Sequence, residues 1–146
     1  MHIEPSIEPG HHEVTFTWHE TDPDLWAHAV LVRLVAVTDH AQDDGDLSPY
    51  LMQPQGDGLW VLSRRLPSTL RSSYQICPIR DEPLHGHPSE ERWMQILAKG
   101  VCDPRNPAIL AAGTTYGNPG PASILELLDS LPQPCTRGVQ GLRKAP

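Results

Sequence analysis

The chain has few cysteines and few aromatic residues, lacks long apolar runs and carries little positive charge. Its three cysteines, Cys77, Cys102 and Cys135, are odd in number and widely spaced, which excludes a disulfide framework and a Cys-x-x-Cys metal motif. No run approaches the roughly 20 apolar residues of a membrane-spanning helix. The best candidate, residues 29–37, is interrupted by Arg33. We therefore expect neither a membrane span nor a disulfide-stabilised secreted fold.

The charge balance excludes a second group of functions. The formal net charge is −7, whereas nucleic-acid and anionic-membrane binding both depend on clustered Lys and Arg. Residues 1–6 show neither the basic nor the apolar segment of a secretory signal. We expect a cytoplasmic protein that binds neither nucleic acid nor membranes.

The length of 146 residues allows one domain of ordinary size. Residues 1–12 are polar and contain Pro and Gly, so we expect a flexible leader there. Residues 13–131 would form the folded domain. Residues 132–146 begin with Pro-Gln-Pro and end with basic residues, which indicates a linker or a disordered tail.

The first half of the domain shows strand patterns. Residues 13–20 alternate, with Val14, Phe16 and Trp18 on one face, as in a half-buried antiparallel strand. Residues 27–37 are apolar on both faces and rich in Val and Leu, which favours a central strand over a helix. The acidic residues 38–48 predict a long exposed loop.

Residues 59–66 and 70–79 predict two further strands, which a Pro-Ser turn would join into a hairpin. The clearest helix covers residues 89–100, with Ser89 as its N-cap and Gly100 as a left-handed C-cap. Residues 124–131 fit either a helical face or an edge strand. Short strands with evenly spaced turns together predict a β-sandwich with one short helix.

The sequence shows no catalytic nucleophile. An α/β-hydrolase places its serine on a tight elbow, Gly-x-Ser-x-Gly, and no such motif occurs here. The histidine pairs His11–His12 and His85/His87 have no evident set of three or four converging ligands, so we expect no metal site. We also expect no cofactor.

The aromatic residues are the first candidates for ligand binding. Trp18 and Trp93 fit core positions, whereas Trp26 and Trp60 are as easily exposed platforms as core residues. An exposed indole could stack on a sugar or on a catechol ring.

Several motifs, weak alone, occur in a characteristic order and resemble a known family. They are Val-Thr-Phe-Thr-Trp at 14–18, Val-Thr-Asp-His at 37–40, Leu-Trp at 59–60, Arg71-x-Ser73-Tyr74, the helix with Trp93, and Asp103-Pro104-x-Asn106-Pro107. Together they resemble the N-terminal domain of enterochelin esterases, which cut catecholate siderophores to release iron. The resemblance implies an immunoglobulin-like sandwich of the early-set type, ahead of an α/β-hydrolase domain that supplies the catalytic groups.

This resemblance implies a function for the chain as a substrate-recognition domain. Its partners would be a ferric catecholate siderophore and an α/β-hydrolase domain, in the same chain or in a separate one. A ferric tris-catecholate is a trianion, so Arg71 would gain from charge and from stacking on a catechol ring. Trp26 and Trp60 complete the expected binding residues. The alternative for Arg71 is an ion pair with one of the many acids.

Two other functions stay open from the sequence. A carbohydrate-binding module of similar architecture would show Trp26 and Trp60 together on one flat surface. A purely structural interaction domain would bind no small ligand.

Overall fold

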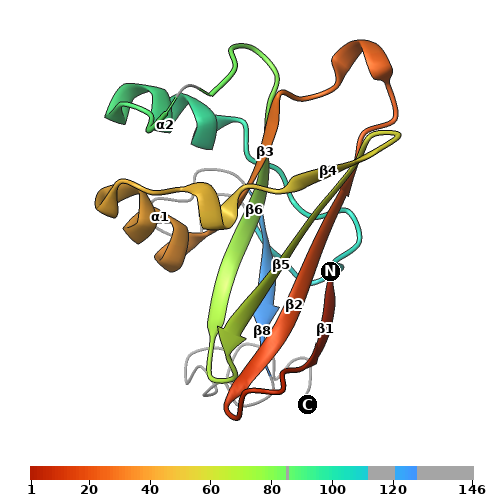
Figure 1. Ribbon diagram of the computed structural model, residues 1–146, viewed down its shortest axis with the longest axis vertical. Coiled ribbons are helices and arrows are strands. Elements are labelled where there is room, and N and C mark those ends of the chain that lie inside the picture. Colours follow the sequence, from red (N-terminus) through yellow and green to blue (C-terminus); the bar gives the residue numbers. More distant parts are fainter. Residues whose placement is uncertain (85, 112–120, 128–146) are drawn as a thin grey trace.

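The computed structural model describes residues 1–84, 86–111 and 121–127, which form two antiparallel four-stranded sheets. Sheet A has the order β1 (His2–Pro5), β2 (His11–His19), β5 (Leu59–Pro67) and β4 (Gln53–Gly56). Sheet B has the order β3 (Ala29–Leu34), β6 (Arg71–Ile79), β8 (Ala122–Glu126) and β7 (Ile109–Leu110). Figure 1 shows the two layers, which confirm the predicted all-β sandwich.

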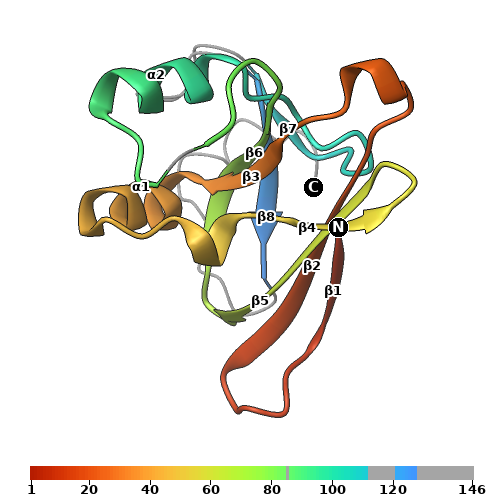
Figure 2. The same cartoon turned by 45° about the horizontal axis from the view of Figure 1, so that its top comes forward.

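The described residues contain two α-helices, α1 (Val35–Asp44) and α2 (Glu90–Ala98), and not the single helix that we predicted. Both lie on the side of β3 and β6 (Figures 1 and 2). Two short 3-10 turns, η1 (Pro23–Leu25) and η2 (Ser48–Tyr50), complete the elements. The helices thus cover the outer face of sheet B.

Helix α1 replaces most of the predicted loop over residues 38–48, because contacts with β3 support its first turn. The Thr38 hydroxyl accepts from the amide of Leu34 at 2.9 Å and donates to the carbonyl of Val32 at 3.0 Å. Gly45, with φ 88°, ends the helix in the left-handed conformation. These hydrogen bonds form only once β3 is in place, so the composition of residues 38–48 alone did not reveal the helix.

The core lies between the inner faces of the two sheets. Val14 and Phe16 of β2 are fully buried, as the alternation predicted. The ring of Phe16 meets that of Tyr74 on β6 edge to face, with centroids 5.2 Å apart and planes at 68°. Strand β3 is buried on both faces, as predicted for residues 27–37, but it ends at Leu34 and is an edge strand of sheet B, so the expected central position is wrong.

The predicted hairpin of residues 59–66 and 70–79 is wrong. Both segments are strands, but β5 belongs to sheet A and β6 to sheet B. Strand β2 pairs with β5 along its whole length and β4 pairs with residues 59–61, whereas β6 pairs with β3 and β8, so the chain crosses from one layer to the other after Pro67. Ser68 is buried at this crossing, where its amide donates to the carbonyl of Gly10 at 2.8 Å.

The first twelve residues are not a loose leader throughout. Strand β1 pairs with β2 in a regular antiparallel register from His2↔Thr15 to Pro5↔His12. The turn between them includes Gly10, whose φ of 77° permits the reversal. The expected tail, residues 132–146, lies outside the described residues.

The predictions for the second half hold in part. Ser89 caps α2, because its hydroxyl accepts from the amide of Arg92 at 3.1 Å. Gly100 does not adopt the left-handed conformation; it lies against Gln75, and a Cβ there would be 2.7 Å from Oε1 of Gln75. The ambiguous segment 124–131 is a strand as far as Glu126, since β8 pairs with β6.

A buried polar cluster fixes the loop over residues 103–107. The Tyr74 hydroxyl donates to Asp103 at 2.8 Å and accepts from the Asn106 amide at 3.0 Å, while Ser123 accepts from the Asp103 amide N–H at 2.8 Å. Burial raises the pKa of the Tyr74 phenol, and the nearby Asp103 carboxylate adds to the shift. These hydrogen bonds tie the loop to β6 and β8 and therefore stiffen the sandwich.

Candidate functional site

Arg71 begins β6 and forms a cross-strand ion pair with Glu126 of β8. Its side chain is 21% exposed, and its Nε is buried without a hydrogen-bond partner among the described residues. The guanidinium is thus partly neutralised within its own sheet. This is the arrangement that we gave as the alternative to a ligand contact.

Trp26 is the exposed tryptophan of the sandwich, and it follows η1 directly. The ring is 43% exposed, and its neighbour Leu25 is 58% exposed. The connection is nevertheless braced, because Asp22 caps η1 and the carbonyl of Leu25 accepts from Nε of Arg80 at 2.8 Å. Two large apolar side chains are therefore held toward solvent on a fixed backbone.

Trp60 lies in the core and is only 9% exposed. It sits on β5 directly opposite Trp18 of β2, and Pro54 of β4 is its partner on the other side. Its ring is therefore not available as an exposed platform. Trp93, at 7% exposure, is also in the core, as expected.

The structure does not bring Arg71 and Trp26 together. The amide of His28, two residues after Trp26, donates to the carbonyl of Ile79, at the end of β6 opposite to Arg71. Strand β6 has nine residues, so its ends are about 26 Å apart at roughly 3.3 Å per residue. The two predicted binding residues thus occupy opposite ends of the sandwich.

Arg80 is a residue that our sequence reasoning missed. Its Nη2 donates to both carboxylate oxygens of Glu20, at 2.8 and 2.7 Å. Glu20 is buried and also accepts from the indole N–H of Trp18 at 3.1 Å. The guanidinium, 41% exposed, thus ties the end of β6 to Glu20, which follows β2, and to Leu25, the last residue of η1. We call Leu25, Trp26 and Arg80 the η1 rim.

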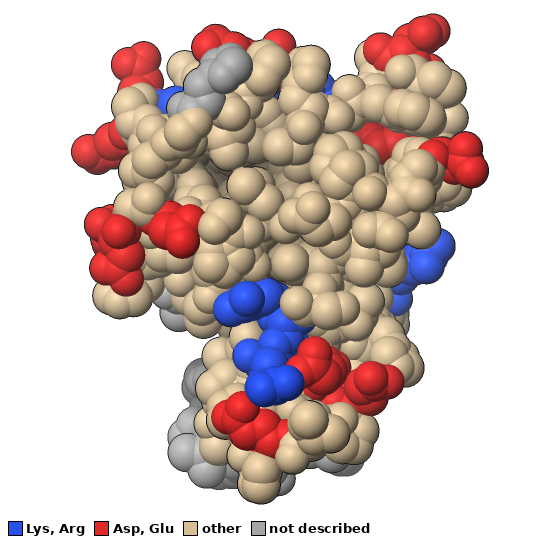
Figure 3. All heavy atoms as spheres, viewed as in Figure 1, with Lys and Arg blue, Asp and Glu red and all other residues tan. Residues whose placement is uncertain are grey.

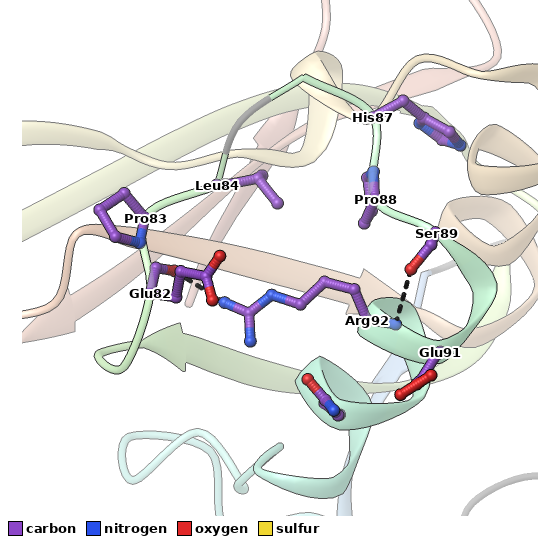
Figure 4. Close-up of a pocket in the computed structure, with 9 residues that line it drawn as sticks. Glu82, Pro83, Leu84, His87, Pro88, Ser89, Glu91 and Arg92 are labelled. Carbon is purple, nitrogen blue, oxygen red and sulfur yellow. Dashed lines mark hydrogen bonds between the residues drawn. The ribbon is translucent and has the colours of Figure 1, made fainter.

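A hollow lies between the loop before α2 and the first turns of that helix. Its volume is about 360 Å³, and Figure 4 shows the residues that line it. They are Glu82, Pro83, Leu84, His87, Pro88, Ser89, Glu91, Arg92 and Gln95.

The charge inside this hollow does not suit an anion. Figure 4 shows Arg92 reaching across it to Glu82, whose carbonyl accepts from Nη2 at 2.7 Å. The same guanidinium bonds both oxygens of Asp81, at 3.1 and 3.2 Å, and holds the pKa of that carboxyl below its usual range. Two carboxylates, Glu82 and Glu91, are left on the lining.

The described residues do not assemble a hydrolytic site. A serine and a histidine do meet, since Nδ1 of His12 lies 2.7 Å from Oγ of Ser68, but both residues are buried. Burial raises the pKa of the Cys77 thiol to about 12, which keeps it protonated and unreactive. In the same part of the chain no three His, Cys, Asp or Glu side chains cluster as metal ligands.

Across residues 1–84, 86–111 and 121–127, no helix is both long and apolar enough to span a bilayer.

The fold and the rim define an antiparallel β-sandwich domain with a braced, apolar edge. Residues 13–135 match the model of the family described as "Enterochelin esterase, N-terminal", and the chain belongs to this family. No curated protein matches the chain.

Solved structures share the fold. The enterobactin esterase from Shigella flexneri, crystallised in the presence of enterobactin, has a TM-score of 0.73 and 24% identity over 91% of this chain. The ferric enterobactin esterase from Salmonella typhimurium has a TM-score of 0.73 and 23% identity over 93%. This chain covers only 34% and 36% of those two chains, about a third of their length.

Proposed function

We propose that this chain is the substrate-recognition domain of a ferric-siderophore esterase that releases iron in the cytoplasm. The observation that carries the proposal is the family match over residues 13–135. The relatives from Shigella flexneri were crystallised with enterobactin and with 2,3-dihydroxy-N-benzoyl-serine, so catechol amides are the ligand class to test. An α/β-hydrolase domain, in the same chain or in another, would cut the ester. An immunoglobulin-like topology of the early-set type is part of the same proposal.

We assign the ligand contact to the η1 rim. An exposed indole on a braced backbone stacks on a catechol ring with little loss of conformational entropy. The guanidinium of Arg80 is engaged by Glu20, so its role is to hold Leu25 and Trp26 in place. Because Trp60 is buried, the paired platform that a sugar-binding module needs is not formed by these two tryptophans.

Arg71 is the competing contact. It carries the charge that a trianion would seek, but Glu126 shares that charge, and the η1 rim is at the far end of β6. A single ligand of siderophore size is not expected to contact both Trp26 and Arg71, because these residues lie near opposite ends of β6. The comparison of Trp26 with Arg71 therefore tests where recognition occurs.

The experiment is a fluorescence titration with ferric enterobactin and with its gallium-loaded form, which separates binding from quenching by iron. Trp26→Ala should weaken binding about tenfold, the equivalent of about 1.4 kcal/mol of stacking. Arg71→Gln is the matched control and should bind normally. Release of cleaved ester would be followed by chromatography in the same samples, with and without a separately expressed hydrolase domain.

Each result has a clear meaning. Loss of binding in Arg71→Gln alone would move the site to the opposite end of the sandwich. No saturable binding, and no effect on the added hydrolase domain, would contradict the recognition function and favour a structural module. Ester cleavage by this chain alone would contradict its accessory role.

A further inference from the structure

Arg64 is one of two Lys or Arg residues of the described chain that have no acidic partner there. Six of the eight basic side chains in that part form ion pairs, namely Arg33, Arg65, Arg71, Arg80, Arg92 and Lys99. Arg105 has no such pair either, but it is exposed and water solvates it. Arg64 is half-buried, so the absence of a described carboxylate beside it requires an explanation.

Arg64 occupies a position that the strand pattern gives to an apolar residue. It stands on β5 directly opposite Val14, which is fully buried, so both belong to the inner face of sheet A. Its neighbours on that face, Leu62 and Leu66, are buried. Burying a guanidinium at such a position costs free energy unless a partner replaces the hydrogen bonds to water that it loses.

The side chain leaves the sandwich under Tyr50, the last residue of η2. The guanidinium carbon lies 5.2 Å from the centroid of the Tyr50 ring, a cation–π contact. Nε is buried and has no hydrogen-bond partner among the described residues. Stacking fixes the plane of the guanidinium and leaves its terminal N–H groups as the available donors.

Strand β4 covers only the first part of β5 on this flank. The two pair between Gln53↔Val61 and Gly56↔Leu59, so the part of β5 beyond Val61 has no strand of the described chain on that side. Figure 3 shows basic side chains at the narrowing of the molecule, with acidic side chains directly beside them. Arg65 belongs to the opposite face of the strand and is paired with Glu8 and Glu13.

We infer that Arg64 and Tyr50 form a binding site for a small oxyanion, a carboxylate or a phosphate. A planar guanidinium recognises both groups through two parallel N–H···O bonds. The protein carries a formal charge of −7, yet none of the described acids occupies this position. A bound anion would satisfy the donors and offset the desolvation of Arg64. The site is distinct from the η1 rim and does not depend on the proposed function.

The test uses benzoate and inorganic phosphate at constant ionic strength, with sodium chloride as the reference. Binding would be followed by calorimetry and by the nitrogen NMR signal of the Arg64 side chain. Arg64→Gln should abolish saturable binding. Arg65→Gln removes the same charge one residue away, on the other face, and should bind like the unmodified chain.

Arg64→Lys is the second variant, because it keeps the charge and loses the fork. It should bind at least roughly fivefold more weakly than the unmodified chain if the planar geometry matters. Binding of benzoate alone would identify a carboxylate ligand, and binding of phosphate alone a phosphate ligand. Equal losses in Arg64→Gln and Arg65→Gln, or no saturable binding of either anion, would overturn the inference.

Discussion

The outer faces of the two sheets differ in whether helices cover them. Helices α1 and α2 cover the outer face of sheet B, and polar groups are buried beneath them. The outer face of sheet A has no such cover in the described chain, and it carries a Thr15–Ser63 hydrogen bond and ion pairs of Arg65. An ion pair between an arginine and a carboxylate therefore contributes differently to the free energy of unfolding on the two faces.

The contrast is clearest between two ion pairs. Arg33 on β3 is 3% exposed and donates to both oxygens of Asp39 in α1, at 2.9 and 2.8 Å. Arg65 on β5 reaches Glu13 at 3.1 Å, and the two side chains are 46% and 32% exposed. Buried pairs are costly to break, whereas exposed pairs contribute little because water replaces either partner.

The largest expected effect comes from breaking the buried pair. Asp39→Ala takes the carboxylate away from a guanidinium that is out of reach of bulk water, and should lower the free energy of unfolding by about 3 kcal/mol. Urea denaturation followed by circular dichroism would measure it. Glu13→Ala is the matched change on sheet A and should leave the unfolding midpoint unchanged. Equal effects of the two changes would contradict the difference between the faces.

A second prediction concerns alkaline pH. Cys77 lies on the covered face of sheet B, and burial raises its pKa from 9.0 to about 12. The folded state holds this proton more tightly, so its contribution to stability is complete below pH 9 and declines as the pH rises toward 12. The slope should reach about 1.4 kcal/mol per pH unit in this window.

Unfolding curves at pH 8, 9, 10 and 11 would show this decline, and Cys77→Ala should reduce its slope. Tyr74 adds a loss of the same sign above its ordinary pKa, because its pKa is also raised. An unchanged slope in Cys77→Ala would mean that the thiol is not protected by the helices.

The smallest effect is expected at the start of α2. Ser89→Ala removes the hydroxyl that caps the helix and should cost about 1 kcal/mol, while Ser89→Asp, also a good cap, should be neutral. Hydrogen exchange would show whether the amides of α2 open first. Faster exchange across sheet A in the same variant would mean that the two layers do not open separately.

The sequence predicted those elements whose pattern is local. The alternation of Val14 and Phe16 identified β2, and Ser89 identified the start of α2, because each depends on near neighbours in the chain. The apolar density of residues 27–37 identified β3, although the strand covers only Ala29–Leu34 and helix α1 begins at Val35. Composition and order of motifs were sufficient for the sandwich and the family.

What the sequence missed depends on how the strands are arranged. Helix α1 depends on β3 through the hydrogen bonds of Thr38. The separation of β5 from β6 depends on strand pairing between distant residues, since β5 pairs with β2 and β6 pairs with β3 and β8. The same holds for the candidate sites. The role of Arg80 follows from its ion pair with Glu20, which the sequence does not show. The sequence also did not tell which of Trp26 and Trp60 is exposed and which is buried.

The crossing of the chain after Pro67 has a consequence for synthesis on the ribosome. All four strands of sheet A precede this point, so that layer can assemble first. Strand β3 is also made early, but its ladder partner β6 follows only afterwards. Until β6 is made, β3 has no ladder partner, although it is apolar and buried on both faces in the folded protein. Nascent chains halted before residue 71 should therefore be the species most prone to aggregate and most in need of a chaperone.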